Sequence, residues 1–222
     1  MRIVVPPTVF RPGSYTWLLA GVIEQEALPP HASVLDLCTG SGALAITAAL
    51  NGADVTAVDV SRRAVATARL NALLNGVRLA ARRSDLLESI GARSFDAIVT
   101  NPPYLPAASA EPPRRGPRRA WDAGRDGRAL LDRILVRAPA HLRPGGVLLV
   151  VHSSLCNAER TLERLREAGL ESSVAARRRG PLGPLLASRT AELEAAGILR
   201  PGERTEELLV LRGRRPAPRC SS

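Results

Sequence analysis

The chain contains no lysine, so its 31 basic residues are all arginines. With 21 acidic residues they give a net charge of +10. Alanine, glycine and proline are also abundant, which is the composition that a GC-rich genome produces. The charge by itself therefore does not establish nucleic-acid binding, although a basic surface attracts polyanions.

Cysteine and aromatic residues are scarce. The cysteines, Cys38, Cys156 and Cys220, lie far apart and show neither a metal-ligand spacing nor a disulfide framework. We therefore expect no metal site and a reducing, cytoplasmic location. Aromatic residues make up 3% of the chain, and no recognisable RNA- or DNA-binding module accompanies the positive charge, which disfavours nucleic acid as the partner.

Long apolar runs are absent as well. No run approaches the ~20 residues that a membrane helix requires, so we expect no membrane association. The first residues are too short in their apolar part and too rich in proline for a signal peptide. At 222 residues and 45% hydrophobic composition, the chain is long enough to bury a substantial core.

Short apolar runs alternate with helical patterns along most of the chain. This alternation predicts an α/β fold of Rossmann-like type, with a mostly parallel sheet covered by helices on both faces. We expect strands at 34–37, 54–58, 77–81, 96–100, 147–151, 171–176 and 207–211. We expect helices near 15–27, 41–51, 61–75, 126–142 and 156–168.

The alternation predicts a single domain over residues 1–212, whose first thirty residues form an N-terminal segment and a helix. Residues 105–125, rich in proline, arginine and alanine, are expected to form a surface loop. Residues 180–204 are expected to be an insertion between the last two strands, with a helix over 187–196 and no function that the pattern reveals. Residues 213–222 lack periodicity and are expected to be a disordered tail.

The strongest local signal is the turn Cys38-Thr39-Gly40-Ser41-Gly42 directly after the first strand. Glycines there permit positive φ and close approach of a ligand, and the helix that follows offers free N–H groups. The spacing also fits a dinucleotide fingerprint. However, Asp36 at the strand end would repel a pyrophosphate, and it suits a cation such as the sulfonium and amino groups of S-adenosylmethionine.

Acidic residues also follow the next two strands. Asp59 could accept hydrogen bonds from both hydroxyls of a ribose, and Asp85, with the Leu86 N–H nearby, could bind the adenine amino group. Asp36 or Asp59 taken alone is better explained as an ordinary strand-end or cap residue. The ordered set at the ends of successive strands favours a cofactor site, and it comprises Asp36, Gly40, Gly42, Asp59 and Asp85.

The motif Asn101-Pro102-Pro103-Tyr104 follows the fourth strand. These residues are common in turns, but this strand end faces the expected cofactor. An amide or exocyclic base nitrogen is a poor nucleophile because its lone pair is delocalised. The Asn101 side-chain oxygen and the Pro102 carbonyl could each accept one N–H and so orient that nitrogen. The two prolines stiffen the loop, and Tyr104 could stack on the planar acceptor group.

These motifs resemble the class I S-adenosylmethionine-dependent methyltransferases, and among them the N5-glutamine methyltransferases of peptide chain release factors (the HemK family). The resemblance covers about residues 9–211. Residues 120–128, Ala-Trp-Asp-Ala-Gly-Arg-Asp-Gly-Arg, are similar to the glycine-rich segment of that family. The pattern Phe10-x-Pro12-x-x-x-Thr16-x-Leu18-Leu19 is similar to its short, archaeal and eukaryotic-type branch.

The resemblance implies a seven-stranded sheet with an antiparallel last strand, S-adenosylmethionine as cofactor and S-adenosylhomocysteine as product. It implies a release factor as substrate, methylated on the glutamine of a Gly-Gly-Gln loop, and a small zinc-binding activator subunit as a further partner. Asn101 would hold the substrate amide. The cofactor contacts that it implies are Thr16, Asp36, Cys38, Thr39, Gly40, Gly42, Asp59, Asp85, Leu86 and Asn101.

The sequence also leaves alternatives open. The branch usually carries an acidic pair just before the threonine, and here those positions are Ser14 and Tyr15. An enzyme that methylates adenine or guanine amino groups of rRNA, tRNA or DNA shares the Asn-Pro-Pro-Tyr motif. A non-catalytic scaffold is a third interpretation. The arginines of residues 114–119 form either a docking surface or a solvated run of charge.

Overall fold

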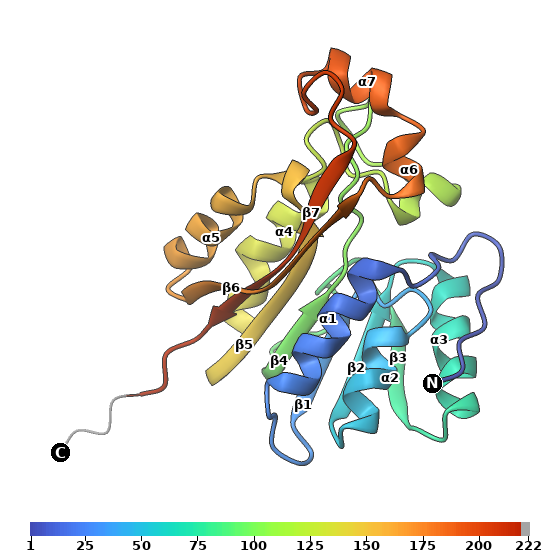
Figure 1. The fold of residues 1–222 in the computed structure, drawn as a ribbon. Coiled ribbons are helices and arrows are strands. Elements are labelled where there is room, and N and C mark those ends of the chain that lie inside the picture. Colours follow the sequence, from blue (N-terminus) through green and yellow to red (C-terminus); the bar gives the residue numbers. More distant parts are fainter. Residues whose placement is uncertain (219–222) are drawn as a thin grey trace.

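A computed structural model of the chain describes residues 1–218, which form an α/β fold around one seven-stranded sheet (Figure 1). The strand order is β3-β2-β1-β4-β5-β7-β6, and β7 runs antiparallel to both of its neighbours. This arrangement confirms the expected fold class, including the antiparallel last strand. The strands are β1 (Ser33–Leu37), β2 (Asp54–Asp59), β3 (Leu79–Arg83), β4 (Phe95–Thr100), β5 (Leu142–Ser153), β6 (Glu171–Pro181) and β7 (Thr205–Arg214).

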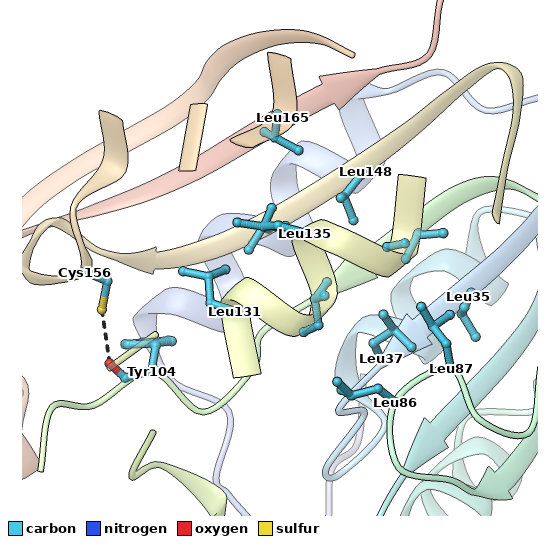
Figure 2. Close-up of a cluster of buried hydrophobic side chains, with 14 of the residues drawn as sticks. Leu35, Leu37, Leu86, Leu87, Tyr104, Leu131, Leu135, Leu148, Cys156 and Leu165 are labelled. Carbon is cyan, nitrogen blue, oxygen red and sulfur yellow. Dashed lines mark hydrogen bonds between the residues drawn. The ribbon is translucent and has the colours of Figure 1, made fainter. Parts of the chain in front are cut away.

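Helices pack on both faces of the sheet. The apolar cluster under α1 (Ser14–Gln25) and α2 (Ala43–Leu50) joins Leu19 and Ala45 to Val34 of β1. The opposite cluster contains Leu131 and Leu165 and lies on the other face of the sheet (Figure 2). Strands covered on both faces must be apolar throughout, which explains the continuous hydrophobic runs of the central strands. The longer helices are α1 (Ser14–Gln25), α2 (Ala43–Leu50), α3 (Arg62–Leu74), α4 (Ala129–Arg137) and α5 (Ala158–Glu167).

The sheet order reverses between β1 and β4. From β1 the chain proceeds outward to β2 and β3, and from β4 it proceeds in the other direction. The connections that leave the carboxyl ends of β1 and β4 therefore diverge, and such a point is where ligands bind in open α/β sheets. The glycine turn follows β1 and Asn101 follows β4, so both lie at this point.

Several expected element bounds are wrong in the second half of the chain. The helix expected over 126–142 ends at Arg137, and a 3-10 turn (Ala138–His141) follows it. Pro139 in that turn has no N–H with which to continue the α-helix. β5 is also longer than expected, since Leu142 already pairs with Phe95 before a bulge in the ladder.

The last two strands are longer than expected. β6 and β7 pair from Glu171 and Arg214 to Pro181 and Thr205, so the insertion between them shrinks to residues 182–204, which we call the cap. The cap contains two short helices, α6 (Pro184–Ala187) and α7 (Thr190–Ala195), instead of one helix over 187–196. In Figure 1 they lie at the end of the β6–β7 hairpin.

β7 extends two residues past the expected domain end at residue 212. Gly213 pairs with Leu148 and Ser172, so β7 continues to Arg214. Residues 219–222, which include Cys220 and the end of the expected tail, lie outside the described residues. Within residues 1–218, no helix is both long enough and apolar enough to span a membrane.

Candidate active site

A cleft of about 1200 Å³ lies at the carboxyl ends of β1, β2 and β4. It brings together most of the residues that the sequence singles out. Asp36 and Gly42 are not among its lining residues. Those that line it are Thr16, Cys38, Thr39, Gly40, Asp59, Asp85, Leu86, Asn101, Pro102, Pro103 and Tyr104.

The turn after β1 contains residues with left-handed backbone conformation, among them Cys38 and Gly40. Cys38 has φ +60° and Gly40 has φ +54°. This conformation directs the Gly40 N–H to the Asp59 Oδ2, at 3.0 Å, while the Asp59 Oδ1 accepts from the Ser61 N–H at 2.8 Å. The turn therefore holds the Asp59 carboxylate in place at the end of β2.

Asp36 lies beneath this turn and is fully buried. Its Oδ2 accepts from the Thr39 hydroxyl at 2.6 Å and from the Ala45 N–H at 3.1 Å, whereas its Oδ1 has no hydrogen-bond partner among the described residues. Burial raises the pKa of Asp36 to about 7. Direct contact with a ligand in the cleft was expected, but the structure places this carboxylate under the cleft floor. An incompletely partnered carboxylate there would favour a cation above it.

Gly42 permits close packing of two helices rather than close approach of a ligand. Its φ is +85°, and a Cβ atom at this position would lie 3.0 Å from both Cα and Cβ of Ala68. α2 and α3 therefore meet closely at Gly42, which explains a glycine that does not reach the cleft.

Asp59 and Asp85 differ in their surroundings. Burial raises the pKa of Asp59, while the hydrogen bonds from Ser61 and Gly40 and the charge of Arg119 act in the opposite direction. Asp85 is less buried and forms an ion pair with Arg133, at 3.1 Å. A ligand that binds the Asp85 side chain would compete with this exposed pair, whose own contribution to stability is small.

Asn101 is oriented by the first helix. Its Nδ2 donates a hydrogen bond to the Thr16 hydroxyl at 3.2 Å. This contact uses the amide nitrogen and leaves the Oδ1 of Asn101 available as an acceptor. Thr16, expected as a cofactor contact, therefore also positions the residue expected to bind the substrate.

Tyr104 is mostly buried, with 5% of its surface exposed. Its ring centroid lies 5.2 Å from that of Tyr15, and its carbonyl accepts a hydrogen bond from the Cys156 thiol at 3.1 Å (Figure 2). Burial raises the pKa of Cys156 to about 12, so this thiol is neutral and can donate. Most of the Tyr104 ring is thus occupied by packing, and little surface is left for the stacking expected of it.

Leu105, directly after Tyr104, pairs with residues 121–123 in a parallel bridge. The Leu105 N–H donates to the Trp121 carbonyl at 2.7 Å, and the Ala123 N–H donates to the Leu105 carbonyl at 2.9 Å. The glycine-rich segment at 120–128 therefore packs beside the Asn-Pro-Pro-Tyr loop. Gly127 lies so close to this loop that a Cβ there would be 2.1 Å from the Tyr104 carbonyl oxygen.

A buried ion pair connects this loop to the cap, and the sequence did not indicate it. Asp122, 1% exposed, accepts from Arg118 at 2.7 Å and from Arg189 of the cap at 2.6 Å. Arg189 also reaches the Pro106 carbonyl at 3.3 Å. Cap residues 183–186 line the cleft as well. A pairing between segments this far apart has no local sequence signal that could have revealed it.

The arginines of residues 114–119 have two different surroundings. Arg114, Arg115 and Arg119 line the cleft, whereas Arg118 is paired with buried Asp122. Part of this segment therefore supports the loop, and the rest adds positive charge at the cleft.

The reversed strand order, the antiparallel β7 and the cleft after β1 and β4 define a class I methyltransferase fold. Among solved structures, the chain is similar to the E. cuniculi Mtq2–Trm112 complex, with a TM-score of 0.67, 24% identity, and coverage of 94% of this chain and 99% of that chain. A T. thermophilus 16S rRNA guanine-N2 methyltransferase, solved with AdoMet and guanosine, gives a TM-score of 0.64 at 22% identity over 92% of this chain and 44% of its own.

The sequence comparisons are more specific. The family model "Methyltransferase small domain" matches residues 10–112. A Methanocaldococcus jannaschii protein assigned as a protein N5-glutamine methyltransferase is 33% identical over 84% of this chain and 93% of its own length. The release factor glutamine methyltransferase of Geobacter sulfurreducens is 42% identical over 66% of this chain, which spans 54% of that enzyme. The chain therefore belongs to the protein N5-glutamine methyltransferases.

Proposed function

We propose that this methyltransferase uses S-adenosylmethionine to methylate the side-chain amide nitrogen of a glutamine in a peptide chain release factor. The observation that carries the proposal is the Asn101–Thr16 hydrogen bond, which leaves the Asn101 oxygen free to accept an N–H. Family membership supports a glutamine as the acceptor. The release factor is supported by the names of relatives such as the Geobacter sulfurreducens enzyme.

The residues of the cleft fit the cofactor. The unpartnered Asp36 oxygen beneath the floor suits a cation, and Asp59, held by Gly40 and Ser61, offers carboxylate oxygens suited to ribose hydroxyls. Cys38, Leu86 and Asp85 complete the adjoining wall. When bound, S-adenosylmethionine supplies an electrophilic methyl group on a sulfonium.

The chain's own residues supply orientation rather than a strong base. The Asn101 Oδ1 and the Pro102 carbonyl accept hydrogen bonds from the two N–H groups of the glutamine amide, which turns the nitrogen lone pair toward the methyl group. One of these two protons leaves to solvent when the nitrogen is methylated, so the product amide is neutral. Pro102 and Pro103 keep these acceptors from moving, and the Cys156 thiol holds the Tyr104 carbonyl behind them. Preorganised acceptors of this kind require no rearrangement during the reaction.

A partner subunit belongs to the same proposal. The E. cuniculi protein was solved as a complex with Trm112. We extend to this chain the expectation of a small activator subunit, which is tested by comparing methyl transfer by the chain alone with transfer after addition of candidate subunits.

The substrate is tested by offering purified release factor, ribosomal protein uL3, tRNA, rRNA and DNA together with a labelled methyl donor. We expect label on the release factor, mapped by mass spectrometry to the glutamine of its Gly-Gly-Gln loop and lost when that glutamine is replaced. The uL3 arm is included because a Bradyrhizobium diazoefficiens relative, 46% identical over 52% of this chain, is a uL3 glutamine methyltransferase. Label confined to nucleic acid would refute the proposal.

The buried Asp36 predicts a pH dependence of cofactor binding. Its pKa in the folded chain is about 7, because burial disfavours the charged form. Below that pH the carboxyl is neutral, and above it the carboxylate attracts the cationic cofactor. We therefore expect affinity for S-adenosylmethionine to rise between about pH 6 and pH 8, with protons released on binding.

Calorimetry in two buffers of different ionisation enthalpy measures this proton release. Asp36→Asn should weaken binding and remove most of the pH dependence. Asp54→Asn, at the exposed start of β2, serves as the matched control and should leave both unchanged. An unaltered pH profile in Asp36→Asn would exclude Asp36 as the titrating group.

A further inference from the structure

A second buried carboxylate near the cleft has no role in the mechanism above. Glu206, near the start of β7, is 4% exposed. Its Oε1 accepts from the Gly183 N–H at 2.9 Å, and its Oε2 has no hydrogen-bond partner among residues 1–218. A buried carboxylate oxygen without a donor is costly, so this atom is suited to an N–H brought by a ligand.

The sheet order places Glu206 on the substrate side of Asn101. The residues proposed to hold the cofactor follow β1, β2 and β3, on one side of β4, whereas β7 lies on the other side. Because β7 is antiparallel, it begins where β5 ends, and Leu208 pairs with Ser153 there. Glu206 is therefore at the same edge of the sheet as Asn101 but away from the proposed cofactor.

The residues around Glu206 connect it to the cleft. Tyr15 and Gly183, which lie beside Glu206, both line the cleft, whereas Glu206 itself does not. Neither the Tyr15 hydroxyl nor the Glu206 Oε2 has a hydrogen-bond partner of good geometry among residues 1–218. Burial, and then the charge of the neighbouring Glu206 carboxylate and its capacity to accept a hydrogen bond from the hydroxyl, raise the pKa of Tyr15 well above its usual value. Glu206 therefore places a carboxylate directly behind the wall of the cleft that Tyr15 and Gly183 form.

The chemistry of this wall selects the ligand group. Leu105, Pro184 and Leu186 make it largely apolar, which disfavours a fully charged ligand. A protein segment instead offers neutral backbone N–H donors, and glycine presents its N–H with no side chain in the way. The unpaired Oε2 of Glu206 can accept an N–H from such a segment, and the neighbouring Tyr15 hydroxyl, whose proton points toward the carboxylate, can accept through its own oxygen.

We propose that Glu206, together with the Tyr15 hydroxyl, is a substrate-positioning site that accepts a backbone N–H from the segment carrying the target glutamine. This inference rests on the proposed function, because it requires a protein substrate. It assigns to the β6–β7 hairpin and its cap the task of holding the main chain while Asn101 holds the side-chain amide.

The first test compares Glu206→Gln with Glu207→Gln. The glutamine at 206 keeps an oxygen for the Gly183 N–H but removes the charge. We expect KM for the release factor to rise about 10-fold, with affinity for S-adenosylmethionine unchanged and no loss of thermal stability. Tyr15→Phe should also raise KM for the release factor. Glu207, whose carboxylate lies 4.0 Å from Arg177, is the matched control and should leave KM unchanged.

The second test distinguishes substrate contact from a purely structural role. Each backbone amide next to the glutamine in a substrate peptide is replaced in turn by an ester, which removes one N–H. At the position whose N–H binds Glu206, the ester should lower kcat/KM of the wild-type chain about 10-fold. The same ester should lower kcat/KM of Glu206→Gln only slightly, because that variant has already lost the contact. Equal ester effects in both proteins would overturn the inference.

The outcomes separate the two proposals. If the wild-type chain binds S-adenosylmethionine but methylates no protein, the proposed function fails and this inference fails with it. If the release factor is methylated but Glu206→Gln leaves KM unchanged, only the role of Glu206 is refuted. A loss of cofactor affinity in Glu206→Gln would place this residue in the cofactor site and would also refute the inference.

Discussion

Asn101→Ala is expected to lower kcat for methyl transfer by at least ~100-fold, which is typical of removing one preorganised polar contact from an active site. The substitution removes the oxygen that accepts the substrate N–H and also the Nδ2 that donates to Thr16 at 3.2 Å. Affinity for S-adenosylmethionine should change little, because the turn after β1 and the Asp59 carboxylate remain. The measurements are single-turnover methyl transfer and calorimetric cofactor binding on the same protein.

Asn51→Ala is the control for Asn101→Ala. Asn51 caps the carboxyl end of α2, where its Nδ2 donates to the Thr47 carbonyl at 3.1 Å, and it does not line the cleft. Its replacement should leave kcat unchanged. If Asn101→Ala weakened cofactor binding as much as it lowered kcat, Asn101 would be a cofactor contact rather than the residue that orients the substrate amide.

Gly127→Ala is expected to be almost as damaging to catalysis, although Gly127 does not line the cleft. The added Cβ would lie 2.1 Å from the Tyr104 carbonyl oxygen, a backbone atom that no side-chain rotation can move away. The Asn-Pro-Pro-Tyr loop must therefore shift, and a misplacement of catalytic groups by about 1 Å can cost ~100-fold in kcat. Crowding and the positive φ of Gly127 should together lower the free energy of unfolding by roughly 2–4 kcal/mol.

Gly197→Ala separates backbone strain from crowding. Gly197 has the same φ of +70°, but a Cβ there would have no atom within 4 Å. It should therefore lose only about 1–2 kcal/mol of unfolding free energy, measured by chemical denaturation, with kcat unchanged. Equal losses in the two variants would show that the Tyr104 contact does not matter. Cofactor binding should survive in Gly127→Ala and so report that the rest of the fold is intact.

The predictable part of the site is the part in which the chemistry-bearing residues follow a strand directly. Asp59 and Asn101 follow apolar runs, and parallel strands bring their carboxyl ends to one edge. Knowing that the strands were parallel was therefore enough to bring these residues together, and both line the cleft. The glycine turn was predictable for a similar reason, because positive φ at Gly40 leaves a local trace in the choice of residue.

Two residues show where a local pattern stops being informative. Asp36 and Gly42 belong to the same turn and were expected to meet the ligand. The structure buries Asp36 beneath Thr39 and Ala45 and presses Gly42 against Ala68 of α3. Whether a residue in a turn faces the cleft or the core depends on the next layer of packing, and this layer is set by residues far along the chain.

By itself the sequence determined the α/β class, the edge of the sheet that carries the chemistry and the family to which the chain belongs. All three follow from short-range patterns: strand periodicity, turn glycines and a contiguous Asn-Pro-Pro-Tyr motif. Only the tertiary structure decided that Arg189 pairs with Asp122 and that Glu206 lies buried beside Tyr15. Those contacts join segments separated by many residues, and their energies depend on burial and distance, which exist only once the sheet has formed.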